Sequence, residues 1–120
     1  MKAQYFPAAH VDEGFGQGSL THGADHRIAT ARRTEPGECE LHERERDVFY
    51  ILAGEATLVT GGVMADAREV APGDWRGSGI IGGEVHPLRA GDVITIPAGL
   101  AHWFREVPQR VDYFVVKIIG

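Results

Sequence analysis

His102 is the side chain whose setting in the sequence most favours chemistry. The strand-like run Val93–Ile96 precedes it, Pro97 ends that run, and Gly99 permits the chain to reverse. We therefore expect His102 to return beside its own hairpin partner, on a rigid element. An imidazole held in this way can act as a metal ligand or as a general base. An isolated strand histidine with a satisfied hydrogen bond is the ordinary alternative.

A second pair of polar residues, Glu40 and His42, has the spacing of neighbours on one strand face. Side chains two positions apart on a strand point the same way, so Cys39 and Leu41 lie on the opposite face. This arrangement predicts that Cys39 is a buried, inert thiol rather than a nucleophile. A solvated strand carboxylate is the ordinary alternative for Glu40.

Short strands between turn residues account for most of the chain. No window of 11 or more residues has helical periodicity, and strand-like runs recur about every 8–12 residues. Val48–Leu52 is the most apolar run, Glu55–Thr60 is expected to be its hairpin partner, and Val111–Ile119 is a last long strand. The pattern predicts an all-β sandwich or barrel over residues 26–119, preceded by a loop-rich arm over residues 1–25.

Composition indicates one soluble globular domain of 120 residues. The net charge is −5 and no run of basic residues stands out, which argues against nucleic acid or an anionic membrane as a partner. A single cysteine excludes an internal disulfide, and no apolar run has the length of a signal peptide or a membrane span. These features favour a cytoplasmic location.

Two segments of the chain resemble the two conserved motifs of the cupin superfamily. Gly91, Pro97, Gly99 and His102 have the spacing of the second motif, and Pro36–Gly54 is similar to the first. The chain therefore resembles a small, single-domain bacterial cupin. The resemblance implies a conserved β-barrel, also called a double-stranded β-helix, in which two antiparallel sheets enclose the site.

The resemblance also implies a metal site. Alignment on Gly54 places Glu40 and His42 at the two histidine positions of the first motif and Asp47 at its glutamate position. Glu40, His42 and His102 then form a set of two histidines and one carboxylate, which binds Fe(II) and also Mn, Ni, Cu or Zn. Asp47 is a fourth ligand or a carboxylate that orients a histidine. Glu40 and Asp47 are also the candidate catalytic residues.

In such a barrel the pocket is lined by side chains that point to the same strand face as the ligands. Phe49 and Ile51 point to the same strand face as Asp47, and Phe104 to the same face as His102. Tyr113 or Phe114 joins them from the last strand. Ordinary core packing remains an equal interpretation for these apolar residues, because a core and a small-molecule pocket have the same composition.

Three functions follow from these expectations. The first is a metal-dependent enzyme that acts on a small organic molecule, by dioxygenase-like oxygenation or by Lewis-acid isomerase or lyase chemistry. The second is a non-catalytic cupin that binds a sugar or small metabolite, with a degraded or absent metal site. The third is a metal-free cupin that uses Glu40, His42 and His102 as acid and base. We also expect a homodimer, because an exposed final strand favours pairing with a second copy.

Overall fold

The structure is a computed structural model that describes residues 1–15 and 19–120, and within these residues it is almost entirely β. The all-β prediction is confirmed, and the last strand has the predicted bounds. No helix in the described part of the chain is long and apolar enough to cross a membrane. The elements in chain order are α1 (Ala8–Glu13), β1 (Ser19–His22), β2 (His26–Arg33), β3 (Cys39–His42), β4 (Glu45–Thr60), β5 (Val63–Ala65), β6 (Arg68–Ala71), β7 (Asp74–Gly77), β8 (Gly79–Ile81), β9 (Glu84–Arg89), β10 (Val93–Ile96), β11 (His102–Glu106) and β12 (Val111–Ile119).

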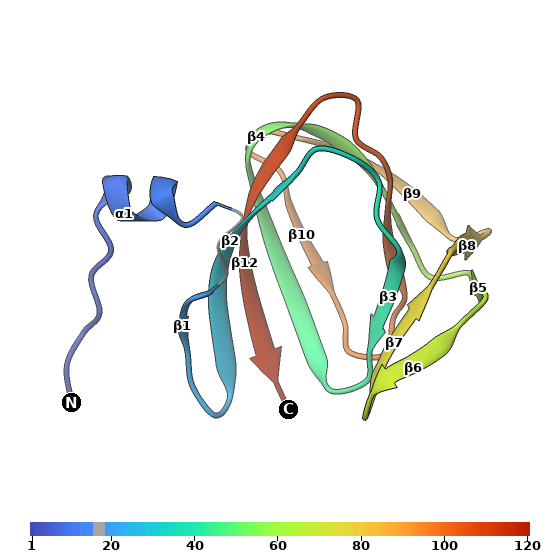
Figure 1. Ribbon diagram of the computed structural model, residues 1–120, viewed down its shortest axis with the longest axis horizontal. Helices are drawn as coiled ribbons and strands as arrows, with labels where there is room; N and C mark the ends of the chain where they lie inside the picture. The colour runs from blue at the N-terminus through green and yellow to red at the C-terminus, as the bar shows by residue number, and fades with distance from the viewer. Residues whose placement is uncertain (16–18) are drawn as a thin grey trace.

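Two antiparallel sheets face one another and share β4, as Figure 1 shows. The first sheet has the order β1-β2-β12-β4-β10, and the second has the order β6-β7-β3-β11-β4-β9. Strands β5 and β8 form a small separate ribbon. The apolar core lies between the two sheets, and its best-buried members include Phe49, Ile51, Leu58, Ile96, Phe104 and Val111.

The expected hairpin between Val48–Leu52 and Glu55–Thr60 is wrong, because both runs belong to the single strand β4. Gly54 adopts a φ of 78° at the middle of this strand, and a Cβ there would lie 1.9 Å from the carbonyl oxygen of Arg110. The glycine therefore bends the strand instead of reversing it. The first half of β4 pairs with β12 and β10, and the second half pairs with β11 and β9.

The expected hairpin that would place His102 beside Val93–Ile96 is also wrong. Strand β10 pairs with the first half of β4, whereas β11 pairs with β3 and with the second half of β4. Pro97 ends β10, and the Gly99 N–H donates to the carbonyl oxygen of His42 at 2.8 Å. This hydrogen bond directs the chain across to β3, so the connection joins the two sheets instead of closing a hairpin.

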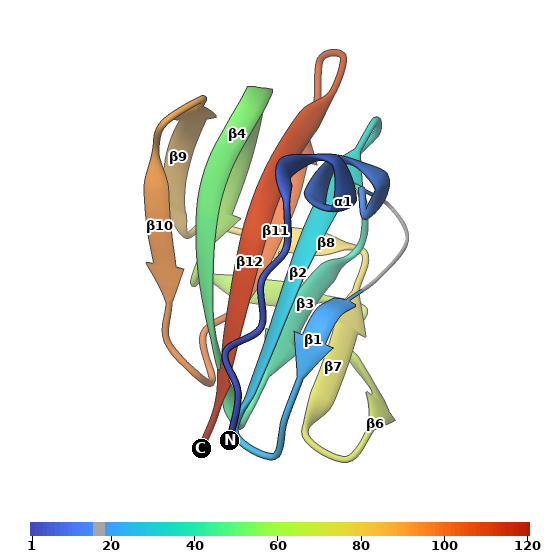
Figure 2. The same cartoon turned by 90° about the vertical axis from the view of Figure 1, so that its left-hand side faces the viewer.

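The N-terminal arm contains more regular structure than its glycine content predicts. Helix α1 has only six residues, too few for helical periodicity to appear in the sequence, and β1 adds an edge strand to β2. Figure 2 shows α1 and the segment before it in front of the first sheet. Residues 16–18 of the expected arm lie outside the described part of the chain, and the division into an arm and a barrel stays a prediction.

Candidate metal centre

Strands β3 and β11 bring the predicted ligands together. His102 and Glu40 are direct partners across this antiparallel pair, and His42 lies two positions along β3 on the same face. Cys39 faces the other way, where its thiol is buried and donates to the carbonyl oxygen of Gly79 at 3.2 Å. The predicted alternation along this strand, with Glu40 and His42 on one face and Cys39 on the other, is therefore confirmed.

The donor atoms of Glu40, His42 and His102 all lie within 4.8 Å of one another. His102 Nε2 is 3.5 Å from Glu40 Oε2, and the His102 side chain is 4% exposed. Two ligand atoms bound to one ion at about 2.1 Å lie about 3–3.4 Å apart, so a small contraction brings this pair to coordination distance. The cluster therefore fits a divalent metal ion.

Asp47 approaches the same point from β4 in the first sheet. Its Oδ2 lies 3.6 Å from His102 Nε2, and the Asp47 side chain is only 2% exposed. Its other oxygen, Oδ1, accepts a hydrogen bond from Lys117 Nζ at 2.8 Å. Asp47 thus keeps one oxygen facing the three-residue cluster, and its ligation stays a prediction.

Glu40 has the same arrangement as Asp47 with a different cation. Arg76 Nη2 lies 3.2 Å from Glu40 Oε1, while Glu40 Oε2 faces His102. Each carboxylate therefore has one oxygen near a cation and the other near His102. This division orients two anionic oxygens toward one imidazole, which suits a shared ion.

Strand β7 contributes two residues that the sequence reasoning missed, Asp74 and Arg76. Strand β7 pairs with β3, so that Asp74 lies opposite His42 and Arg76 lies opposite Glu40. Asp74 Oδ1 is 3.1 Å from His42 Nδ1, which leaves Nε2 as the free nitrogen of that ring. Asp74 also contacts the guanidinium of Arg76. The two-residue spacing of Asp74 and Arg76 was visible in the sequence, but no motif marked it.

The electrostatics favour the protonation states in which these groups bind metals. Burial raises the pKa of Glu40, but the hydrogen bond with His102 and the charges of His102 and Arg76 outweigh it and lower that pKa to about 2. Burial lowers the pKa of His42, and the positive charges of Lys117 and His102 lower it further. Glu40 is therefore anionic and His42 neutral near pH 7, as ligation requires.

His102 has one buried nitrogen, Nδ1, with no hydrogen-bond partner among the described residues. Its Nε2 faces the two carboxylates, which are acceptors, so Nε2 is placed to donate to them or to bind an ion that they share. A buried polar atom without a partner raises the free energy of the folded state.

The sequence matches no protein-family model and no curated protein. Among similar solved structures, a cupin superfamily protein from Desulfitobacterium hafniense has 15% sequence identity and a TM-score of 0.60, and the match covers 86% of this chain and 75% of that one. A conserved protein with a double-stranded β-helix domain from Klebsiella pneumoniae has 17% identity and a TM-score of 0.65, over 99% of this chain and 92% of that one. Hydroquinone 1,2-dioxygenase from a Sphingomonas species, with 4-hydroxybenzoate bound, has 17% identity and a TM-score of 0.63, over 85% of this chain and 64% of that one. This chain has the cupin fold. It spans slightly less than two thirds of the dioxygenase chain, and cupins carry many activities, so function must come from the site.

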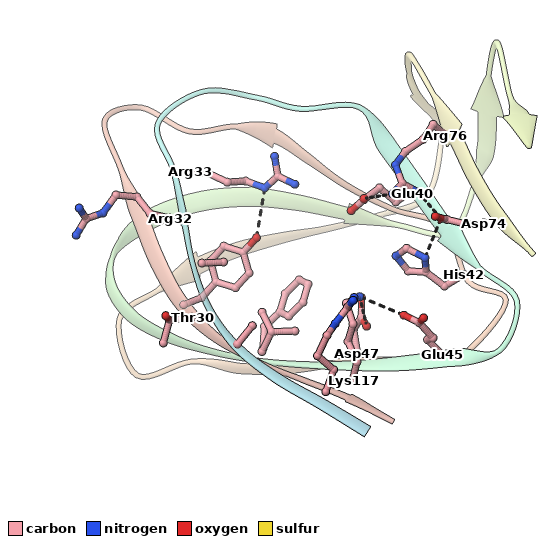
Figure 3. A pocket seen from close by; sticks show the side chains of 16 residues that line it. Thr30, Arg32, Arg33, Glu40, His42, Glu45, Asp47, Asp74, Arg76 and Lys117 are labelled. Atoms are coloured by element: carbon pink, nitrogen blue, oxygen red, sulfur yellow. Dashed lines mark hydrogen bonds and ion pairs between the residues drawn. The ribbon is translucent and has the colours of Figure 1, made fainter. Parts of the chain in front are cut away.

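Inside the cupin barrel, the cluster of Glu40, His42 and His102 borders a cavity of about 580 Å³ between the two sheets. Figure 3 shows Glu40 and His42 on one side of this space and Arg33 on the other. Glu40, His42 and Asp47 line the cavity, while His102 lies behind them in contact range of both carboxylates.

All four predicted pocket residues belong to the apolar core, and two of them also line the cavity. Phe49 and Tyr113 line the cavity, with ring centroids 4.9 Å apart. Ile51 and Phe104 belong to the apolar core beneath those two rings. Strand parity alone does not separate the two groups, because a side chain that points inward meets either empty space or a neighbour from the facing sheet.

Proposed function

We propose that this chain is a metal-dependent enzyme that acts on a small organic molecule, with dioxygenase-like oxygenation as its reaction. The observation that carries the proposal is the convergence of Glu40, His42 and His102 beside a cavity of about 580 Å³. That volume lies in the range of small-molecule sites. The similar fold of a hydroquinone 1,2-dioxygenase supports the same reaction class.

The residues around the cluster prepare it for one ion and one organic ligand. A bound Fe, Mn, Ni, Cu or Zn ion supplies Lewis acidity, and the redox-active members of this set also supply O₂ chemistry. Asp74 holds the ring of His42, and Arg76 holds one oxygen of Glu40. Phe49 shields the cluster from the core side, with its ring edge-on to His102 at a centroid distance of 6.2 Å.

The same cluster also suits Lewis-acid isomerase or lyase chemistry, in which Asp47 is the proton carrier. Its carboxylate is buried and reaches both His102 and Lys117, so a proton delivered there is shielded from bulk water. Isomerisation under nitrogen would favour this reaction over oxygenation, because it needs no O₂.

One observation favours a non-catalytic cupin that binds a sugar or small metabolite without a metal. Arg76 contacts Glu40 and Lys117 contacts Asp47, so each of the two carboxylates that face His102 is already paired with a cation before any ion is added. A fixed cation beside a carboxylate weakens the attraction of that carboxylate for a metal ion. This alternative requires the same cavity but no ion.

Elemental analysis of protein purified without chelator or added metal distinguishes the proposals. We expect a stoichiometric divalent transition metal in the native protein and its loss in both His42→Ala and His102→Ala. His86→Ala is the matched control, because His86 lies outside the cluster and pairs with Thr60 at 2.8 Å. Metal-free native protein that still binds a metabolite would support the non-catalytic alternative instead.

We further propose that the chain is a homodimer and that it is cytoplasmic. The outer face of the first sheet presents exposed apolar side chains from three strands, including Tyr50 on β4, Val93 on β10 and Ile118 on β12. Such a face favours association with a second copy. Light scattering after size-exclusion chromatography should give twice the 13.0 kDa of one chain, and a particle of 13.0 kDa would contradict the dimer.

A further inference from the structure

Arg33 presents a positive charge to the cavity on the side opposite the metal cluster. Strand β2 places Arg33 and Ala31 on the cavity side, and Arg33 is only partly exposed to solvent. Among the described residues no carboxylate lies within ion-pair distance of Arg33, although its neighbour Arg32 forms two hydrogen bonds with Asp112, at 2.8 and 3.0 Å.

The other cations around the cavity differ from Arg33. Arg76 contacts Glu40 and Asp74, and Lys117 contacts Asp47 and Glu45. Arg27 also lacks an acidic partner within the described chain, but it is exposed to solvent, so water satisfies its charge. Arg33 is thus a partly buried cation that lines the cavity, and no described residue balances its charge.

The surroundings of Arg33 hold its guanidinium in place without neutralising it. Its Nε donates to the Tyr113 hydroxyl at 3.3 Å, and its Cζ lies 5.0 Å from the centroid of the Phe104 ring. A Cβ at Gly37 would lie 2.5 Å from Arg33 Nη1, so the guanidinium packs against the open face of this glycine and a larger residue there would displace it. Trp103 Nε1 donates to the Gly37 carbonyl oxygen at 3.0 Å and anchors that turn.

Two sets of donors therefore meet at this end of the cavity, where the described part of the chain offers them no carboxylate. The terminal nitrogens of Arg33 carry N–H groups that no described carboxylate accepts, and the Tyr113 hydroxyl accepts from Arg33 while its own proton remains to be donated. Burial raises the pKa of Tyr113, which keeps that proton in place near neutral pH. An anionic acceptor would satisfy both groups.

We propose that Arg33 and Tyr113 form the subsite for the carboxylate of a small organic acid, whose other end reaches the cluster of Glu40, His42 and His102. This inference rests on the proposed function, because the other end of the acid would reach the proposed metal site. A planar carboxylate matches the fork of a guanidinium, and tyrosine adds a third donor.

The cavity between the two ends suits the body of such an acid. Ala29 and Ala31 contribute minimal side chains on β2, while Val115 on β12 and Phe49 on β4 supply apolar surface beside them in the same sheet. A flat or short aliphatic body can lie over these residues, with its charge at Arg33. Small side chains at positions 29 and 31 are what leave this space open.

Titration calorimetry with benzoate, benzamide and inorganic phosphate tests the carboxylate subsite. Benzamide has the shape of benzoate without its charge, and phosphate has charge without a planar carboxylate. Native protein, Arg33→Gln and Tyr113→Phe are compared, with Arg89→Gln as the matched control because Arg89 is exposed and lies outside the cavity. Each protein is measured as purified and after chelation, and thermal melting checks that it is folded.

We expect benzoate to bind the native protein at least about 10-fold more tightly than benzamide or phosphate. Arg33→Gln should weaken benzoate binding about 10- to 100-fold, as expected for a lost charge-assisted hydrogen bond, and Tyr113→Phe about 2- to 10-fold. Arg89→Gln should leave the affinity unchanged. If Arg33→Gln does not fold, Tyr113→Phe and the comparison of benzoate with benzamide decide the question.

Several results would overturn the inference: no benzoate binding by folded native protein, equal affinity for benzamide, tighter binding of phosphate, or full affinity in a folded Arg33→Gln or in Tyr113→Phe. The proposed metal function fails separately. If the protein holds a metal but binds benzoate independently of Arg33, the metal function stands and the carboxylate subsite is wrong. If the protein is metal-free but its benzoate binding depends on Arg33, the carboxylate subsite stands and the metal function is wrong.

Discussion

Two walls of the same cavity have opposite electrostatic designs. The ligand wall consists of Glu40, His42, His102, Asp74 and Arg76 on β3, β11 and β7, and there each cation faces an acid. The opposite wall, on β2 and β12, includes Arg33, whose charge has no acidic partner among the described residues. The ligand wall has two carboxylates for one arginine, and its converging donor atoms suit a small cation, whereas a sheltered cation without an acidic partner suits an organic anion.

Asp47 connects the two walls, because it faces His102 and pairs with Lys117 on β12, and breaking this pair should have the largest effect. Lys117→Met leaves the Asp47 carboxylate, 2% exposed, without its cation. Removal of one partner from a buried pair lowers the free energy of unfolding by about 3 kcal/mol. Urea unfolding of chelated protein measures this loss, with Lys2→Met as an exposed control.

The same variant also tests whether Asp47 belongs to the ligand wall. If Asp47 is a fourth ligand, a divalent ion should stabilise Lys117→Met more than it stabilises the native protein, because the ion replaces the missing cation. Equal stabilisation of the two proteins would show that Asp47 pairs with Lys117 but does not bind the ion.

Glu40→Gln removes one anionic oxygen from the ligand wall and should have the next largest effect. We expect the metal affinity to fall at least about 100-fold, at or above the 10- to 100-fold range for residues that only support a ligand. Competition with a chromophoric chelator gives the affinity, and Glu38→Gln is the control because Glu38 is exposed and pairs with Arg68. Unchanged affinity in Glu40→Gln would remove Glu40 from the ligand set.

Asp74→Asn should weaken metal binding less, by about 10-fold, because Asp74 acts through the ring of His42. The His42 Nδ1 proton should then exchange faster with solvent in NMR spectra of the zinc-loaded protein, since the amide is a poorer acceptor than the carboxylate. Asp66→Asn is the control, because Asp66 lies outside the cavity and pairs with Ser78. Full metal affinity together with slow exchange would show that Asp74 does not orient His42.

The pair of Arg32 and Asp112 on the outer side of β2 and β12 should have the smallest effect and a defined pH dependence. Hydrogen bonds from Arg32 hold the pKa of Asp112 below its usual value, so the pair stabilises the folded state above about pH 4, the unfolded pKa. This contribution disappears as pH falls through the lower folded-state pKa. Asp112→Asn should lower stability by about 1 kcal/mol at pH 7, because Arg32 is 39% exposed. Unfolding at pH 7 and pH 3 should show the difference shrinking, and a difference that grows at pH 3 would contradict the assignment.

Within the ligand wall, the positions of Glu40, His42 and His102 were largely predictable from sequence. Glu40 and His42 share a strand face through local spacing, and His102 follows a proline–glycine turn that limits how the chain continues. The predicted hairpin for His102 was nevertheless wrong, because a turn determines where a strand ends but not which strand it joins. The hydrogen bond from Gly99 to His42 makes that choice.

The supporting residues were not predictable in the same way. Asp74 reaches His42 through the pairing of β7 with β3, and Lys117 reaches Asp47 through the pairing of β12 with β4. These contacts join residues far apart in the chain, and their register depends on how the two sheets close. Local spacing contains no signal for such register.

By itself the sequence determined that this chain is all-β, which strand faces carry Glu40 and His42, and that His102 begins a strand after a turn. These properties depend on alternation and turn chemistry, which are local. The folded barrel decided that the three residues meet, that Asp74, Arg76 and Lys117 surround them, and that Arg33 faces the cavity with no acidic partner among the residues that the structure describes. The reason is that distances between strands follow from sheet pairing and closure, which are set by the whole core.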